Sequence, residues 1–225
     1  MSPRVVALVP ARNEEDRVGT TVSALLEIPD VDEVVVVDDG STDGTASEAL
    51  AAGAVVLQIR RPAGKGRALE GALRRSPSPE VWLFADADLG ETAGVLGSLL
   101  EPVLGGVADI AVGTFPPGPG GGFGLVKRFA SRAIRLLSGF EATEPLSGQR
   151  AITASALAVC RPVARGFGVE TAMTIDAVRA GLRVLEVPLP LSHRSTGRDL
   201  RGFAHRGRQG LDIFLAVVPR ALGLR

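Results

Sequence analysis

The chain has 225 residues, no formal net charge and 45% hydrophobic residues, which fits one α/β domain with a sizeable core. Aromatic residues make up only 4%, and no stacking platform or binding motif is visible, so nucleic acid is not an expected partner. Cys160 is the single cysteine, which excludes an internal disulfide. No signal-peptide pattern or membrane-spanning apolar run is present, so we expect a cytoplasmic location.

The charge is unevenly distributed, because residues 193–225 carry seven arginines and two aspartates. Such a basic end has three interpretations: a contact for phosphate groups, a peripheral contact with an anionic membrane at its inner face, or a solvated face. The arginines are Arg194, Arg198, Arg201, Arg206, Arg208, Arg220 and Arg225.

Expected strands and helices alternate through the first half, which predicts a mostly parallel sheet with right-handed crossovers. The expected strands are residues 5–9, 33–37, 54–59, 81–85 and 108–112. The expected helices are residues 16–27, one after the loop 38–45 with Thr42 or Asp43 as N-cap, one ending near Arg75, and 91–104.

The second half is less regular. Residues 115–122 are almost entirely proline and glycine, which predicts a loop over the site or a connection. An amphipathic helix over 123–139, a polar turn over 144–150, a helix over 171–180 and a strand over 183–187 follow. The last apolar helix has three possible roles: packing on the core, pairing in a homodimer, or lying on a membrane.

Two carboxylates, Asp86 and Asp88, follow the strand 81–85 directly. Ligands of α/β sheets gather beyond the carboxyl ends of the strands. Paired carboxylates repel each other unless a cation lies between them, and Mg²⁺ or Mn²⁺ prefers oxygen ligands together with substrate phosphates. The spacing therefore indicates a metal–diphosphate site, and the alternative is that the two aspartates cap the next helix.

Other charged residues follow neighbouring strands. Glu14 and Glu15 come after the first strand, and Asp38 and Asp39 after the second, so these carboxylates can converge with the pair on one crevice. Lys65 lies between two glycines and, with the nearby arginines 60, 61 and 67, can neutralise a diphosphate. The first 90 residues thus contain the parts of a nucleotide-diphosphate site.

Two common nucleotide motifs are absent. Residues 10–15 contain no glycine, which excludes the dinucleotide fingerprint after the first strand. Residues 64–66 lack the spacing and hydroxyl of a P-loop. The glycine-rich turn of a sugar nucleotidyltransferase is also missing, which argues against that enzyme class.

Residues 10–15, 37–45, 64–66 and 86–88 together resemble a family-2-type glycosyltransferase of the GT-A fold. The resemblance implies one domain over 1–225, with a Rossmann-like nucleotide-sugar half over 1–113 and an acceptor half over 114–225. It implies that Asp39 binds the base, that Pro10, Arg12 and Glu14 line the nucleoside pocket, and that Lys65 lies near the diphosphate. Asp86 would contact the ribose, and Asp88 the Mg²⁺ or Mn²⁺ ion. The usual donors of such families are UDP- or GDP-linked sugars.

The second half is similar to glucosyl-3-phosphoglycerate synthases and to polyprenyl-phosphate sugar transferases. This similarity implies that His193 completes the metal site, although a surface histidine is an equal alternative. It also implies that the acceptor, a small phosphorylated molecule or a lipid phosphate, binds residues of the polar turn and the basic segment. Those residues are Ser147, Gly148, Gln149 and Arg194.

The prediction is a metal-dependent glycosyltransferase that moves a sugar from a nucleoside diphosphate to an acceptor hydroxyl or phosphate. Asp88 and Glu170 are the expected catalytic residues. Glu170 would act as a base for the acceptor or bind it, or else stabilise the start of its helix. The sequence leaves inverting and retaining chemistry open. The competing class is a nucleotide-sugar-binding protein without turnover.

Overall fold

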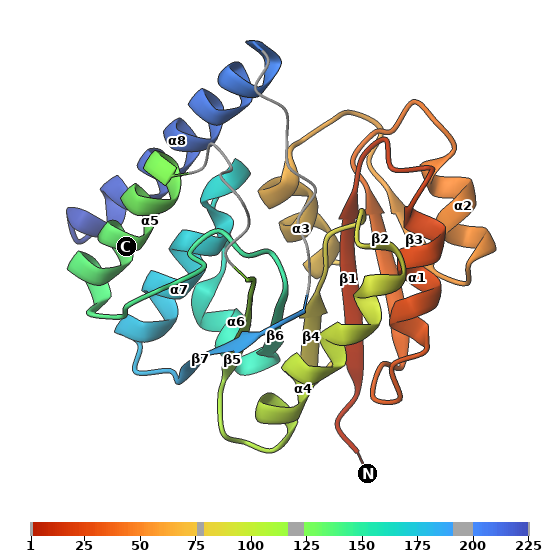
Figure 1. The fold of residues 1–225 in the computed structure, drawn as a ribbon, viewed down its shortest axis with the longest axis horizontal. Helices are drawn as coiled ribbons and strands as arrows, with labels where there is room; N and C mark the ends of the chain where they lie inside the picture. The colour runs from red at the N-terminus through yellow and green to blue at the C-terminus, as the bar shows by residue number, and fades with distance from the viewer. Residues whose placement is uncertain (1, 76–78, 117–123, 191–199, 225) are drawn as a thin grey trace.

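The computed structural model describes residues 2–75, 79–116, 124–190 and 200–224, and the side chains of 200–208 are not described. One seven-stranded sheet crosses the molecule in the order β3-β2-β1-β4-β6-β5-β7 (Figure 1). The strands are β1 Val5–Ala11, β2 Glu33–Asp38, β3 Val55–Gln58, β4 Val81–Phe84, β5 Ile110–Thr114, β6 Arg150–Thr153 and β7 Val184–Pro188. Only β6 runs antiparallel to its neighbours β4 and β5, so the predicted mostly parallel α/β sheet is confirmed.

Helices cover both faces of this sheet. In chain order they are α1 Val18–Leu26, α2 Thr45–Ala51, α3 Lys65–Leu73, the 3-10 helix η1 Gly90–Leu96, α4 Gly97–Leu104, α5 Gly124–Ser138, α6 Ala154–Cys160, the 3-10 helix η2 Gly166–Gly168, α7 Val169–Arg179 and α8 Leu200–Ala221. Alternate residues of a strand point to opposite faces. Val5 and Val9 therefore pack with α1, η1 and α4, whereas Val6 and Leu8 pack with α3, α6 and α7.

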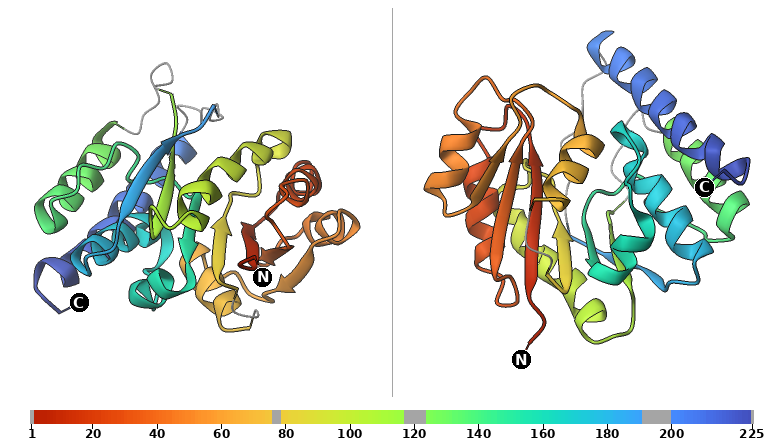
Figure 2. Two further views of the ribbon diagram at one scale, coloured as in Figure 1. Left: turned by 90° about the horizontal axis from the view of Figure 1, so that it is seen from below. Right: turned by 180° about the vertical axis from the view of Figure 1, so that it is seen from behind.

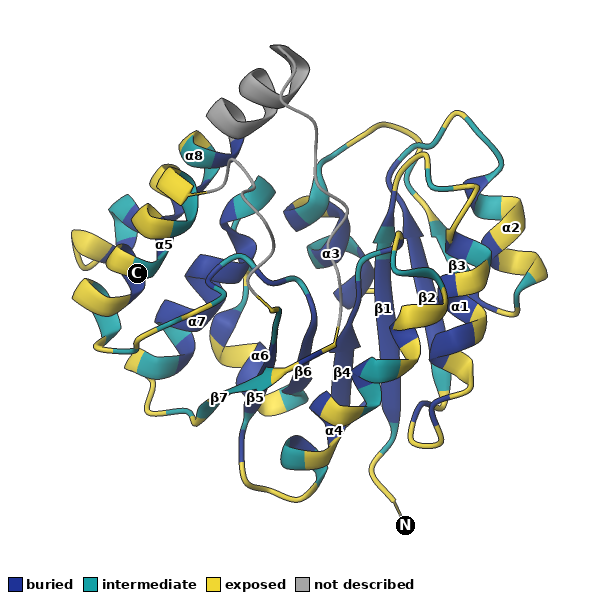
Figure 3. Ribbon diagram, viewed as in Figure 1, coloured by how far each residue is buried: buried dark blue, intermediate teal, exposed yellow. Residues whose placement is uncertain are grey.

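Helices α5 and α8 lie side by side outside α7 (Figures 1 and 2). A third apolar cluster joins the three helices, with Ile134 of α5, Ile175 of α7 and Ile213 of α8 at its centre. Arg220 is buried and forms an ion pair with Asp176, which ties α8 to α7. The packing interpretation of the last helix is thus confirmed for one face, and a solvated role for Arg220 is wrong. The central strands β1, β2 and β4 are buried, whereas the outer helix α5 carries exposed residues (Figure 3).

Several local predictions need correction. Strand β6 and helix α6 were not predicted, because a short strand after a polar turn has little periodicity of its own. The predicted helix over 91–104 begins as the 3-10 helix η1, and Gly44 rather than Thr42 or Asp43 is the N-cap of α2. Strands of both halves of the chain share the sheet, and the division into nucleotide and acceptor halves stays a prediction. Among the described residues, none of the helices is both long enough and apolar enough to cross a bilayer.

Candidate active site

The site lies where β1, β2 and β4 end and β6 begins. These three strands are parallel, so their carboxyl ends share one edge of the sheet. Because β6 runs the other way, its first residue, Arg150, pairs with Phe84 at the end of β4. This register places the turn before β6 next to Asp86.

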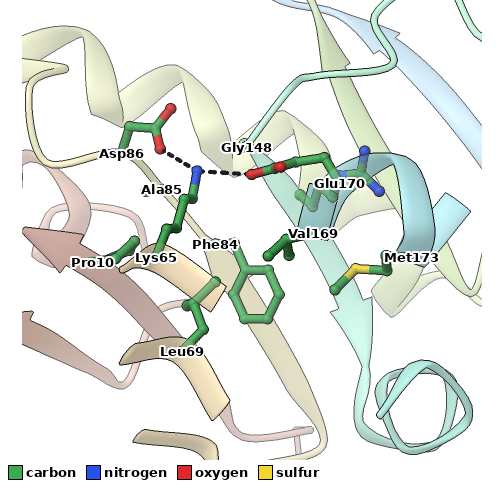
Figure 4. A pocket seen from close by; sticks show the side chains of 11 residues that line it. Pro10, Lys65, Leu69, Phe84, Ala85, Asp86, Gly148, Val169, Glu170 and Met173 are labelled. Carbon is green, nitrogen blue, oxygen red and sulfur yellow. Dashed lines mark hydrogen bonds and ion pairs between the residues drawn. The ribbon is translucent and has the colours of Figure 1, made fainter. Parts of the chain in front are cut away.

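Lys65 joins carboxylates from two parts of the fold. Its Nζ lies 3.0 Å from Oδ1 of Asp86, which follows β4, and 2.8 Å from Oε1 of Glu170, in the first turn of α7. Figure 4 shows the lysine between the two acids, with Phe84, Leu69, Val169 and Met173 below them. The first turn of α7, where Glu170 was expected to stabilise the helix start, therefore also makes an ionic contact with α3.

Glycine is required on each side of Lys65, for a different physical reason at each position. Gly64 has φ +84°, a left-handed conformation that favours glycine at the turn into α3. At Gly66 an added methyl group would collide with the carbonyl oxygen of Ala164, so only glycine lets α3 approach that loop. Together they fix the first turn of α3 and aim Lys65 at the end of β4.

The electrostatics of Lys65 favour its charged form. Burial opposes the charge, but the attraction of Asp86 and then of Glu170 outweighs burial and raises the pKa of Lys65 above its ordinary value. The side chain is still 26% exposed, so a bound anion can reach it. Lys65 is therefore a permanent cation at neutral pH.

The turn 147–149 contacts the same carboxylate. Nε2 of Gln149 donates to Oδ2 of Asp86 at 2.8 Å. A methyl group added at Gly148 would lie 2.8 Å from Nζ of Lys65 and 2.9 Å from Oδ1 of Asp86. Ser147 is buried, and its hydroxyl lies 3.4 Å from Oε1 of Gln149. The turn 147–149, which is predicted to bind the acceptor, thus contacts Asp86, which is predicted to bind the ribose. Both roles stay predictions.

Arg150 is a site residue that the sequence analysis missed. It is 1% exposed, and its guanidinium donates to the carbonyl of Ser147 and to the hydroxyl of Thr174. Its Nη2 has no hydrogen-bond partner among the described residues. Burial lowers the pKa of Arg150, and the charge of Glu170 opposes that shift. An arginine directly after the Ser-Gly-Gln turn was the only available signal.

Asp39 supports the loop in front of α3. Its two carboxylate oxygens accept the backbone N–H groups of Ala63 and Gly64 at 2.7 and 2.8 Å. Each carboxylate oxygen has a second lone pair, so this carboxylate can still accept a bond from a base. Pro10 lines the small pocket that contains Lys65 and Asp86, whereas Arg12 is exposed and does not line that pocket.

The loops after β1 and β2 are tied together. Oδ1 of Asn13 accepts the N–H of Thr42 at 2.9 Å, and Oε2 of Glu15 accepts the N–H of Gly44 at 2.7 Å. The N–H of Glu14 donates to Oγ1 of Thr45 at 2.8 Å. Acidic residues after the first strand therefore help to hold the loop, in addition to the nucleoside role predicted for Glu14.

Asp88 lies at the open side of the site. Its side chain is exposed and, within the part of the chain that the structure describes, its carboxylate has no hydrogen-bond or ion-pair partner. The capping alternative is wrong, because η1 begins without a side-chain cap. An exposed carboxylate of this kind is suited to a hard divalent cation, which usually takes one or two carboxylates and substrate phosphates. No group of three metal-binding side chains occurs among the described residues, and His193 and Arg194 lie outside them.

Comparisons with known proteins agree with this geometry. The model of the family described as "Glycosyl transferase family 2" matches residues 6–157. The chain is 33% identical to a glucosyl-3-phosphoglycerate synthase of Mycolicibacterium paratuberculosis, over 96% of this chain and 72% of that protein. It is 29% identical to an undecaprenyl-phosphate mannosyltransferase of Micrococcus luteus, over 87% of this chain and 86% of that protein.

The fold is also similar to solved structures. A crystal structure of glucosyl-3-phosphoglycerate synthase from Mycobacterium tuberculosis, in complex with Mn²⁺, uridine diphosphate and phosphoglyceric acid, matches with a TM-score of 0.81 and 28% identity. That match covers 97% of this chain and 78% of the other. The predicted GT-A fold is thereby confirmed.

Proposed function

The chain belongs to glycosyl transferase family 2, and on this premise we propose that it transfers a sugar from a nucleoside diphosphate to a phosphorylated acceptor. The observation that carries the proposal is the double contact of Lys65 with Asp86 and Glu170. Asp86 follows β4 at the nucleotide edge, and Glu170 begins α7 in the acceptor half. One cation thus links the place where a diphosphate leaves with the place where an acceptor attacks.

On the donor side, Asp39, Pro10, Arg12 and Glu14 would surround the nucleoside, and Asp86 its ribose. Asp88, with His193, would hold Mg²⁺ or Mn²⁺, which when bound offsets charge on the leaving diphosphate. Lys65 is already charged and lies at the end of β4, so it would stabilise the diphosphate as the bond to the sugar breaks. A donor phosphate would compete with Asp86 for its ammonium group.

On the acceptor side, Glu170 would accept the proton of an attacking hydroxyl or orient the acceptor. Its carboxylate is buried and forms an ion pair with Lys65, which holds it beside the acceptor turn. Gln149 and Gly148 form the wall between Glu170 and Asp86 (Figure 4 shows Gly148 there). Arg194 would contact an acceptor phosphate.

The exposed apolar residues of the two outer helices support a lipid-linked acceptor as a second candidate. They include Leu125 and Leu136 of α5, 75% and 74% exposed, and Phe214 and Leu215 of α8, 51% and 59% exposed. Exposed arginines accompany them on α5, at positions 128, 132 and 135. Apolar residues beside arginines are suited to the surface of an anionic membrane.

One assay tests the function and separates the acceptors. Purified chain is incubated with UDP- and GDP-sugars, Mn²⁺, Mg²⁺ or EDTA, and either 3-phosphoglycerate or a short polyprenyl phosphate. The proposal expects metal-dependent release of nucleoside diphosphate with one acceptor, lost in Lys65→Met. Lys127→Met is the matched control, because Lys127 lies on α5 and forms its ion pair with Glu144 rather than with Asp86 or Glu170. Metal-dependent nucleotide binding without turnover with any donor would instead support the binding-protein alternative.

For the lipid acceptor, flotation with anionic vesicles is the second measurement. We expect Phe214→Ser with Leu215→Ser to release the protein if the outer helices lie on a membrane. If the same pair of changes instead converts a dimer to a monomer in light scattering, the exposed face joins two copies.

A further inference from the structure

A second hollow lies on the side of the sheet that carries α3, near the edge strand β3. Its volume is about 440 Å³, within the range of about 300–1,000 Å³ typical of ligand pockets. Val37, Leu57 and Ile59 of the sheet form an apolar floor. The hollow shares none of its lining residues with the pocket around Lys65, Asp86 and Glu170. We call it the α3 groove.

Three arginines line the α3 groove: Arg60 after β3, and Arg67 and Arg75 from α3 and its end. All three are exposed, and within the described residues none of them has a side-chain hydrogen bond or an ion pair. No acidic residue lines the groove, so its positive charge is not balanced by its own walls. Arg60 and Arg67, which were expected to help neutralise a diphosphate, line this groove, and their role toward the donor stays a prediction.

The spacing along α3 directs these charges to one place. Positions 67 and 71 are four residues apart on α3, which places them on one face of the helix, and Arg75 follows in the turn just past the helix end. The middle position is Gly71, and an added methyl group there would meet nothing within 4 Å. A glycine inside a helix costs about 1 kcal/mol relative to alanine, and no packing contact requires it here. Its effect is to keep the groove open between two guanidinium groups.

We propose that the α3 groove binds a small phosphorylated molecule with a flat or apolar body. Guanidinium groups bind phosphate in a bidentate manner and stack on flat rings, which matches the arginines at the rim. The apolar floor would cover the organic part of the ligand. The three arginines favour an anionic ligand. The volume and the apolar floor of the groove favour a small amphipathic molecule over a bare ion.

The groove is physically connected to the donor site. Ala63 lines the groove, and its N–H donates to Oδ1 of Asp39 at 2.7 Å. A ligand held by Arg60 and Arg67 would therefore contact the same segment, 60–67, that carries Lys65. Occupancy of the groove is expected to change the affinity of the donor site for nucleotide, and linkage requires the reverse effect to be equal.

The test uses 1-naphthyl phosphate as the probe, because it combines one phosphate with a flat apolar body. Binding to the full chain is measured by calorimetry in EDTA, which suppresses metal-dependent binding at the donor site. We expect 1-naphthyl phosphate to bind at least tenfold more tightly than 1-naphthol or inorganic phosphate. The double variant Arg67→Glu, Arg75→Glu should lose at least tenfold in affinity.

Two further variants keep the proposal falsifiable. Gly71→Leu fills the groove without removing a charge and improves helix propensity, so it should abolish binding while the melting temperature stays the same or rises. Arg74→Glu is the matched control, since Arg74 is a neighbouring exposed arginine that does not line the groove. Equal weakening by Arg74→Glu, or binding that survives both Gly71→Leu and the double variant, would overturn the proposal. Retention on anionic vesicles that depends on Arg67 and Arg75, without binding of the probe, would also overturn it.

Discussion

The ammonium group of Lys65 lies 2.8 Å from the carboxylate of Glu170, although the two residues are more than 100 positions apart in the chain. This ion pair connects the first turn of α3 with the first turn of α7. Since Lys65 also contacts Asp86, both carboxylates help to raise the pKa of Lys65 above its ordinary value. Changes to any one of them should therefore alter both binding and pH dependence.

Glu170→Gln should lower kcat by about a hundredfold or more, the usual contribution of a positioned base. Because the attraction of Glu170 helps to raise the pKa of Lys65, the same change should lower that pKa. The alkaline limb of the kcat profile should then move to lower pH. The control is Glu144→Gln, which removes the ion pair between Glu144 and Lys127 of α5 and should leave the pH profile of kcat unchanged. An unchanged alkaline limb in Glu170→Gln would argue against coupling to Lys65.

Gly148→Ala should reduce activity without loss of the fold. The added methyl group would lie within 3 Å of both Lys65 Nζ and Asp86 Oδ1, so the ion pair must shift, while the backbone of Gly148 is not in the left-handed region. We expect about a tenfold or larger loss of kcat/KM, because small displacements at a reacting centre are costly. Gly124→Ala has open space around it and should be neutral. Wild-type turnover by Gly148→Ala would show that the arrangement of Lys65 and Asp86 beside Gly148 is not required for activity.

Gln149→Leu should weaken binding of metal and nucleotide together. Nε2 of Gln149 orients Asp86, and removal of such supporting hydrogen bonds typically costs about 10- to 100-fold in metal affinity. Calorimetry with UDP and Mn²⁺ measures the change. Ser147→Ala, which removes only a 3.4 Å contact with Gln149, should change the affinity less than threefold. Equal effects of both substitutions would contradict the orienting role.

The free energy of unfolding should depend on pH through the carboxyl group of Glu70. Burial opposes its charge, but hydrogen bonds from Arg161, from the N–H of Val163 and from Arg74 outweigh burial and lower the pKa of Glu70. A lowered carboxyl pKa gives stability that is present above the ordinary pKa of the group and lost as the pH falls through the folded value. Glu70→Gln should therefore cost about 1 kcal/mol at pH 7 and much less near pH 3. Urea unfolding at both pH values measures this, and a pH-independent difference would refute it.

The residues that follow strands were predictable from the sequence. Apolar runs that end in Asp39 and Asp86 place both carboxylates at one edge of a parallel sheet, and the glycines beside Lys65 indicate a tight turn into a helix. These features depend on local patterns and on a topology rule. They can therefore be predicted without any knowledge of contacts between residues far apart in the chain.

The contacts made by β6 were not predictable in the same way. Gln149 reaches Asp86 only because β6 runs antiparallel beside β4, and the polar turn 144–150 gives no sign of that register. Arg150 and Arg220 are similar cases, since arginines in polar or basic segments are usually solvated, but both are buried with partners here. Burial of such residues is decided by tertiary packing.

The central claim is that the carboxylates after β4, with Lys65, bind the diphosphate of an activated sugar through a divalent ion. Titration calorimetry of UDP and GDP into the purified chain, in Mn²⁺ and in EDTA, tests it most directly when repeated with Asp88→Asn. We expect one of the two nucleotides to bind at least tenfold more tightly with Mn²⁺, and Asp88→Asn to remove this difference. Equal affinity in Mn²⁺ and EDTA, or a metal effect that persists in Asp88→Asn, would contradict it.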